Sequence, residues 1–320
     1  MTPGDQMTVS LPDLSVALIT PYSFETIRRT VRHLCAQTLA SRIELLLCVP
    51  VAGGFDLDWD AVAPLHSTRI LEVGEVTKSG PARARAARHA SAPVVVYAED
   101  HCFPDPGWAE ALLRAHHGPH AAVGPAFRNA NPEAAVSWAD FILGYGRWMV
   151  PGRAGVVPLL PGHNSSYKRE MLQAYGSDLD DLMEAETVLF WDLRRRGHTL
   201  YFEPAATTAH MNFEKLSVWL SVTWHLGRVF AAKRTRDWAW PRRLAYGCAA
   251  PLIPVIRLSH TLRSLRRNRV DVRQVARALP PIALALVVDA VAQATGAISG
   301  PGSSTPHLTA YEFLRERHRV

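Results

Sequence analysis

The sequence predicts a doubly wound, mostly parallel α/β sheet flanked by helices, with a helical extension toward its carboxyl end. Three observations support this fold class. Short apolar runs recur up to about residue 210, amphipathic stretches of helical length separate them, and after about residue 233 two long apolar runs follow. Because parallel neighbouring strands need a crossover connection, this alternation indicates parallel strands joined by right-handed crossovers.

The first hundred residues contain four predicted strands and two predicted helices. Residues 14–20 are apolar and β-branched and are followed by Pro21, as is typical of a strand, and residues 25–39 repeat apolar side chains on one helical face. The continuous apolar run at 93–98 fits an interior parallel strand that is buried on both faces. The same signals predict strands at 43–49 and 69–73 and a helix at 80–90.

Beyond that run, Pro104 and Pro106 are expected to exclude regular structure until a helix begins at Trp108. Residues 129–158 are consistent with either a mobile loop or a packed amphipathic helix. The tail GPGSSTP, residues 300–306, has a composition typical of disorder. The other predicted elements are helices at 108–117, 168–174 and 181–196, strands at 121–127 and 199–202, and a polar turn at 162–166.

Two apolar runs, 244–262 and 278–298, dominate the last third of the chain. Each is near the roughly 20 residues that a bilayer-spanning helix needs, although prolines and charged residues interrupt both. A membrane-embedded hairpin or interfacial helices is the preferred interpretation, and helices packed on a soluble domain are the alternative. The sequence therefore predicts an α/β domain over residues 1–235 and a helical, membrane-associated region over 236–320.

Composition limits the class of protein and its compartment. The net charge of +6 comes largely from arginines between the two apolar runs. These arginines fit an anionic membrane surface better than nucleic acid, because stacking aromatic residues are not interleaved with them. The four cysteines have no CxxC spacing, and the first residues lack the pattern of a signal peptide. We expect a reducing setting on the cytoplasmic side.

Polar residues follow the apolar run at 93–98 directly. Glu99, Asp100 and His101 would lie at the carboxyl edge of the sheet, where α/β proteins bind ligands. Carboxylate and imidazole groups together suit Mn2+ or Mg2+ bridging a diphosphate. An acid that only caps the next turn is the alternative. Glu184 and Glu186 could likewise serve only a helix dipole, and His210 could be a surface histidine.

Four segments, taken in their order along the chain, favour a functional role for these polar residues over the structural alternatives. They are LSVALITPYSFETIRRTVRHLCAQTL, GPARARAARHASAPVVVYAEDHCFPDPGWAEALL, PGHNSSYKREML and EAETVLFWDLRRRGHTLYFEPAATTAH. Together they resemble family 2 of the inverting nucleotide-sugar glycosyltransferases, which have the GT-A fold. The resemblance covers residues 14–210, about 60% of the chain.

The resemblance implies a role for each matching position on the donor side. Glu99, Asp100 and His101 stand at the DxD-type metal motif, with His101 in the place of its last aspartate, and His210 matches a histidine often found near the diphosphate. Asp100, His101 and His210 are the expected metal ligands. The positions expected to bind the donor nucleotide are Pro21, Tyr22, Gly80, Pro81, Arg85, Glu99 and Asp100.

On the acceptor side, the resemblance matches Gly162, His163 and Asn164 to a turn that faces the acceptor. Glu186 falls on the catalytic base, with Glu184 as the second candidate, and Ala185 stands where the family has a glutamate. A carboxylate is needed there because the acceptor hydroxyl must lose its proton as it attacks.

The resemblance thus implies a metal-dependent inverting glycosyltransferase that uses a nucleotide-sugar donor and acts on a glycan or lipid-linked, cell-envelope acceptor. The QxxRW motif of processive members does not occur, so transfer of a single sugar is expected. One alternative is a catalytically silent GT-A-like module with a nucleotide-binding or assembly role. A nucleotidyltransferase is disfavoured, since TPYSFET after the first strand supplies no lysine-bearing glycine-rich loop.

Overall fold

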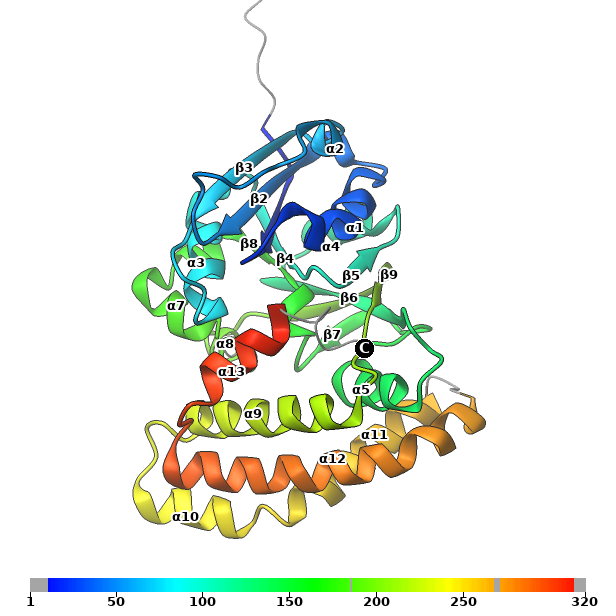
Figure 1. Ribbon diagram of the computed structural model, residues 1–320, viewed down its shortest axis with the longest axis vertical. Coiled ribbons are helices and arrows are strands. Elements are labelled where there is room, and N and C mark those ends of the chain that lie inside the picture. Colours follow the sequence, from blue (N-terminus) through cyan, green and yellow to red (C-terminus); the bar gives the residue numbers. More distant parts are fainter. Residues whose placement is uncertain (1–10, 185, 268–270, 314–320) are drawn as a thin grey trace, which may run out of the picture.

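A computed structural model describes residues 11–184, 186–267 and 271–313, which form a nine-stranded mixed sheet flanked by helices (Figure 1). The strand order is β3-β2-β1-β4-β8-β6-β9-β5, with β7 beside β9. Strands β1 to β4 pair in parallel, which confirms the predicted fold class. The strands are β1 Leu14–Ile19, β2 Ile43–Val49, β3 Ser67–Glu72, β4 Val94–Ala98, β5 Cys102–Pro104, β6 Ala122–Asn129, β7 Gly155–Val157, β8 Ser166–Lys168 and β9 Leu200–His210.

Helices cover both faces of the parallel half of the sheet because alternate residues of a strand point to opposite faces. Leu14, Val16 and Leu18 of β1 pack with α1 and α4, whereas Ala17 and Ile19 pack with α3 and α8. The helices of these two layers are α1 Phe24–Cys35, α2 Trp59–Val62, α3 Ser79–His89, α4 Trp108–His116, α6 Arg169–Gln173, α7 Leu179–Leu182 and α8 Glu186–Arg195. Single turns of 3-10 helix occur at Ala40–Arg42, Gly162–Asn164 and Gly176–Asp178.

The segment after β4 differs from the prediction. Instead of irregular chain, Cys102–Pro104 forms strand β5, which pairs antiparallel with the end of β9 and places Cys102 opposite His210. Pro104 is tolerated because it ends a strand at the edge of the sheet. The pairing with β9 brings the polar residues that follow β4 beside a segment about a hundred residues further along the chain.

Strand β9 is also longer than predicted. The sequence suggested an end at Phe202, but the strand continues past Pro204 to His210. The register against β6 shifts between Pro125 and Ala126. Pro204 falls between the partners of these two residues and therefore lies in an irregular part of the pairing. This extension carries His210 to the same edge of the sheet as the residues after β4.

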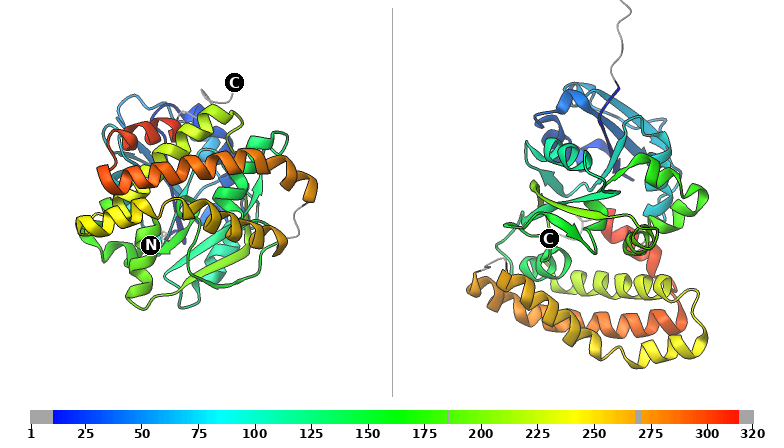
Figure 2. Two further views of the ribbon diagram at one scale, coloured as in Figure 1. Left: turned by 90° about the horizontal axis from the view of Figure 1, so that it is seen from below. Right: turned by 180° about the vertical axis from the view of Figure 1, so that it is seen from behind.

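A third layer of helices lies beneath the sheet (Figures 1 and 2). The helices are α5 Ala135–Tyr145, α9 Leu216–Arg234, α10 Trp240–Cys248, α11 Leu252–Arg267, α12 Val272–Ser299 and α13 Ser304–Phe313. Helices α9 and α12 pack closely: a Cβ on Gly296 would lie 2.3 Å from the carbonyl oxygen of Arg228. Helix α5 confirms the packed-helix interpretation for Ala135–Tyr145, whereas Gly155–Val157 of the same segment forms strand β7.

Helix α12 is, among the described helices, the one that is long and apolar enough to cross a membrane. One of its faces nevertheless holds a buried polar network. Asp289 accepts hydrogen bonds from Arg257 at 2.6 Å and from Gln293 at 2.8 Å, and Tyr246 donates to Gln293 at 2.5 Å. The first apolar run is divided between α10 and α11.

Two further predictions need correction. The single helix expected at 181–196 is two helices, α7 and α8, separated by a turn at residues 183 and 184. The tail predicted to be disordered contains the start of α13 at Ser304. This helix is stabilised by contacts with α9, which a composition-based prediction does not consider.

Candidate active site

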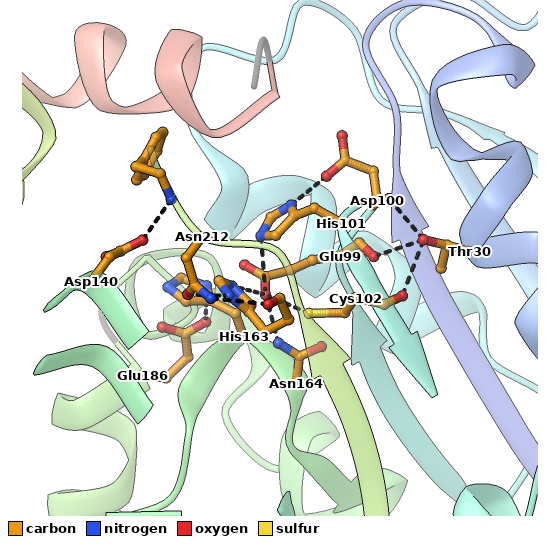
Figure 3. Close-up of polar contacts among 12 residues, drawn as sticks. Thr30, Glu99, Asp100, His101, Cys102, Asp140, His163, Asn164, Glu186 and Asn212 are labelled. Carbon is orange, nitrogen blue, oxygen red and sulfur yellow. Dashed lines mark hydrogen bonds and ion pairs between the residues drawn. The ribbon is translucent and has the colours of Figure 1, made fainter. Parts of the chain in front are cut away.

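The site lies where β4 ends, and Glu99 is its centre (Figure 3). The side chain of Glu99 is buried, and its Oε2 accepts hydrogen bonds from Asn164 Nδ2 at 2.5 Å and from Cys102 Sγ at 3.4 Å. The same oxygen lies 3.5 Å from His101 Nε2 and 3.8 Å from His210 Nε2. A buried carboxylate is therefore met by two imidazoles, a thiol and an amide.

Four of these groups could hold a metal ion together. One ligand atom from each of Glu99, His101, Cys102 and His210 lies within 4.8 Å of all the others, and all four residues are buried. The structure thus brings together two of the predicted metal ligands, His101 and His210. Glu99, expected within the metal motif and at the donor nucleotide, joins them, and Cys102 is a possible ligand that sequence reasoning missed.

Asp100, the third predicted ligand, lies outside this cluster. Its Oδ1 is 2.5 Å from His101 Nδ1, so it orients the ring whose Nε2 faces Glu99. His101 Nε2 is buried and has no hydrogen-bond partner among the described residues. A buried nitrogen without a hydrogen-bond partner is costly unless a further group, such as a cation, satisfies it.

His210 is fixed in a similar way. Its Nδ1 donates to Asn212 Oδ1 at 2.8 Å, which directs Nε2 toward the cluster. The ring also lies edge-on to that of His101, at 4.9 Å between centroids, and 4.2 Å from the ring of Tyr145 in α5. Both imidazoles therefore have a partner on one nitrogen and face the cluster with the other.

The turn at Gly162–Asn164 connects this cluster to a second carboxylate. Asn164 contacts Glu99, and the neighbouring His163 places Nδ1 3.1 Å from Oε1 of Glu186. Gly162 is required here, because a Cβ would lie 2.9 Å from Oε2 of Glu186. All three residues of the predicted acceptor-side turn thus lie at the site.

Glu186 begins α8 and is buried in an ion pair with Arg83, whose Nη1 donates to Oε1 at 2.7 Å. Burial raises the pKa of the carboxyl group, but the charges of His163 and Arg83 outweigh it and lower the pKa to about 2. Glu186 is therefore ionised at neutral pH. Its low pKa makes it a weak base while Arg83 stays in place.

Glu184, the second candidate for the base, has a different position. Its Oε2 accepts a hydrogen bond from the backbone nitrogen of Gly80 at 2.8 Å and so caps the start of α3. A Cβ on Gly80 would lie 2.3 Å from the carbonyl oxygen of Asp180, so this glycine permits close packing of α3 on α7. Pro81 is exposed in the first turn of α3. Ala185 lies outside the described residues.

The arginine that reaches the site is Arg83. The predicted residue, Arg85, is exposed on the other side of α3. The helical period could have identified this arginine from the sequence. In a helix that starts at Ser79, position 83 lies on the buried face with Gly80 and Ala87, whereas position 85 does not. The predicted arginine, Arg85, is therefore two positions along α3 from Arg83, the arginine that lines the site.

A small pocket opens beside the cluster. It is lined by the ends of β1 and β4, by Arg83, by Asp100 and His101, and by Phe313 at the end of α13. The predicted donor-side residues Pro21 and Tyr22 directly follow β1, partly buried and exposed respectively. Since β1 and β4 are parallel neighbours, the segments after both strands lie at this edge of the sheet.

Comparisons with known proteins identify the family of the chain and its fold. The model of the family "Glycosyl transferase family 2" matches residues 15–176. No curated protein matches the chain. A solved structure of the mannosyltransferase PcManGT from Pyrobaculum calidifontis, in complex with GDP-Man and Mn2+, is similar at 17% identity and a TM-score of 0.51, covering 96% of this chain and 88% of that chain. A structure of S. aureus TarS 1-349 with UDP matches at 16% identity and a TM-score of 0.44, covering 90% of each.

Proposed function

The chain belongs to glycosyl transferase family 2, and we propose that it is a metal-dependent, inverting enzyme that moves a single sugar from a nucleotide-sugar donor to a hydroxyl group. The observation that supports this proposal most directly is that two buried carboxylates, those of Glu99 and Glu186, lie at one edge of the sheet. Glu99 lies among potential metal ligands, and Glu186 lies across the turn at Gly162–Asn164.

The cluster of Glu99, His101, Cys102 and His210 fits a divalent cation. Two imidazole nitrogens, a carboxylate and a thiol favour a transition-metal ion over Mg2+, which prefers oxygen ligands, and among the transition metals we propose Mn2+. The complex of PcManGT with GDP-Man and Mn2+ supports this choice. When bound, the cation would offset the negative charge that grows on the nucleoside diphosphate as the sugar leaves.

Arg83 and Glu186 supply the remaining chemistry that we propose. Arg83 lines the pocket and carries a permanent positive charge beside the ligand cluster, so it can contact the donor diphosphate. Glu186 accepts the proton of the acceptor hydroxyl as that oxygen attacks the anomeric carbon. Attack by the acceptor itself, in line with the departing diphosphate, inverts the anomeric centre and needs no nucleophile from the protein.

Movement of Arg83 toward the diphosphate would also affect the base. In the present arrangement Arg83 and His163 hold the pKa of Glu186 at about 2. Withdrawal of the guanidinium toward the donor removes one of these two charges and raises the proton affinity of the carboxylate. Glu186 thus becomes a better base when the donor is present.

We further propose that the acceptor is a lipid-linked or cell-envelope glycan on the cytoplasmic side of the membrane. Leu284, Val287 and Val291 expose apolar side chains along one face of α12, and Arg273 and Arg277 are exposed near its start. An apolar face bordered by arginines is typical of a helix lying at an anionic membrane surface. The close packing of α12 on α9 favours this orientation over a free membrane span.

The test is a screen of nucleotide sugars for release of nucleoside diphosphate, with and without Mn2+, in the presence of vesicles that contain lipid-linked acceptors. The proposal predicts release that requires Mn2+ and a product with inverted anomeric configuration. A silent nucleotide-binding module would bind nucleotide without release, and this outcome would refute the enzyme. Sedimentation with anionic vesicles, compared between the wild type and Val287→Glu, tests the membrane surface separately.

A further inference from the structure

Helix α13 turns back toward the sheet after α12 ends (Figure 1). The connection contains Gly300 and Gly302, with φ of 77° and 53°, in the left-handed region that glycine adopts without strain. Arg228 of α9 donates a hydrogen bond to the carbonyl oxygen of Gly300 at 3.2 Å. Two glycines on either side of Pro301 give α13 a connection that can act as a hinge.

Ring stacking and hydrogen bonds between side chains attach α13 to α9. The imidazole rings of His225 and His307 stack at 5.0 Å between centroids, and Ser304 Oγ lies 3.2 Å from His225 Nδ1. Ser221 Oγ donates to the Tyr311 hydroxyl at 3.1 Å. Hydrogen bonds between side chains can be exchanged for hydrogen bonds to water, so this attachment is suited to reversible release.

At its far end, α13 places Phe313 on the pocket beside the ligand cluster. Phe313 packs against the core between the sheet and α3, and it lines the pocket together with Arg83, Asp100 and His101. Figure 3 shows α13 passing over the side of the site that carries Asp100 and His101. The space that remains is about enough for one water molecule. A nucleotide sugar needs a far larger site.

We propose that α13 is a displaceable cover of the donor site, in which Phe313 occupies space that the nucleotide sugar must take. This inference rests on the proposed function, since it requires that the donor binds beside Arg83 and the ligand cluster. Donor binding and α13 docking then exclude each other. The apparent affinity for the donor is reduced by the fraction of molecules in which α13 is docked.

The covered arrangement has a chemical consequence. With α13 docked, Arg83 remains paired with Glu186, and the cluster is shielded on the side of Phe313. Entry of the donor displaces Phe313 and offers Arg83 a diphosphate partner. The same event therefore opens the site and changes the environment of the base.

The test uses the full chain and two measurements. Calorimetry with GDP, UDP, ADP and dTDP in the presence of Mn2+ compares the wild type with Phe313→Ala, with His307→Ala, and with the control Val287→Ala on the exposed face of α12. Removal of the phenyl ring is expected to tighten binding of the cognate nucleotide on the order of tenfold, and loss of the imidazole stack by a smaller factor. Because Val287 belongs to the proposed membrane surface, Trp59→Ala, which removes an exposed aromatic ring from α2, is a second control, and both should bind nucleotide as the wild type does.

Hydrogen exchange of the wild type gives the second measurement, which does not depend on a variant that folds. Amides of residues 304–313 should exchange faster when nucleotide and Mn2+ are bound. Slower amide exchange in α13 when nucleotide is bound, or weaker nucleotide binding by Phe313→Ala, would mean that Phe313 contacts the bound donor. Either result would overturn the proposal that α13 is a displaceable cover. Nucleotide binding that leaves exchange in α13 unchanged would overturn the cover alone, whereas no binding by any of the proteins would overturn the proposed function with it.

Discussion

Glu99 and Glu186 are both buried carboxylates at the same edge of the sheet, yet their surroundings differ. Glu186 pairs with the guanidinium of Arg83, and burial together with the charges of Arg83 and His163 sets its pKa at about 2. Glu99 meets imidazole, thiol and amide groups. A buried carboxylate needs compensation for the loss of water. Glu186 receives it from the guanidinium of Arg83, whereas Glu99 receives hydrogen bonds from Asn164 and Cys102, to which we propose that a bound cation adds.

This difference supports the separate roles that we propose for the two groups. An arginine partner keeps the carboxylate of Glu186 ionised and fixed in direction, and the proposed withdrawal of Arg83 toward the donor then raises its proton affinity. A carboxylate grouped with two imidazoles and a thiol offers ligand atoms that converge on one point. The turn at Gly162–Asn164 contacts both residues through His163 and Asn164, so the two roles are held in fixed relation.

The largest expected effect comes from removing the base. Glu186→Gln keeps a carbonyl oxygen for Arg83 but cannot take a proton, so transfer should fall about 10²- to 10⁴-fold while donor affinity stays close to that of the wild type. Product formation under saturating donor measures the first, and calorimetry measures the second.

Glu184→Gln is the matched control, because the same change is made at a residue that caps α3. It should retain most of the activity. If Glu184→Gln abolishes transfer and Glu186→Gln does not, the assignment of the base is wrong.

The next largest effect tests the Glu99 cluster. His210→Ala removes one of four converging ligands and should weaken Mn2+ binding about 100-fold, measured by electron paramagnetic resonance of free Mn2+. His120→Ala is the control, since His120 stacks on Tyr201 outside the cluster. Mn2+ affinity that His210→Ala leaves unaltered would exclude this site.

Asp100→Asn sharpens the same experiment. Asn can still accept a hydrogen bond from His101 Nδ1 but lacks the charge. If Asp100 only orients His101, this substitution should lower the affinity for Mn2+ about tenfold. A loss as large as that of His210→Ala would mean that Asp100 itself binds the ion.

The smallest effect concerns stability and pH. The folded pKa of Glu186, about 2, lies below the ordinary value of 4.5, so its ion pair stabilises the fold above about pH 4.5 and this stabilisation is lost as the pH falls toward 2. Urea unfolding at pH 6 and pH 3 should show a larger decrease in the free energy of unfolding for the wild type than for Glu186→Gln, by a few kcal/mol. Equal decreases would show that the pair does not form.

Much of the fold follows from local patterns. The parallel half of the sheet and helices α1, α3 and α4 were predicted because an apolar run or a helical period is a property of neighbouring residues. Strands β5 and β8 were not predicted, since each is three residues long and exists through pairing with distant strands. The break between α7 and α8 has the same explanation: Glu184 leaves the helical path and caps α3.

The residues of the candidate site likewise fall into those that the sequence marks and those that only the folded structure brings to the site. Glu99, Asp100 and His101 are marked in the sequence by their position directly after a buried strand, and His210 and Glu186 by a family resemblance. Cys102 and Arg83 were missed. Cys102 becomes a possible ligand only because β5 pairs with β9, and Arg83 faces the site because of the rotation at which α3 packs on the sheet.

By itself, the sequence determined the class of fold, the family and the edge of the sheet that holds the candidate site. These depend on periodicity and on motifs whose residues are close in the chain. The tertiary structure alone decided which carboxylate has an arginine partner, which four ligand atoms converge, and that Phe313 lies on the pocket. Each of these depends on the packing of segments distant in the chain, and local sequence patterns do not encode the distances between them.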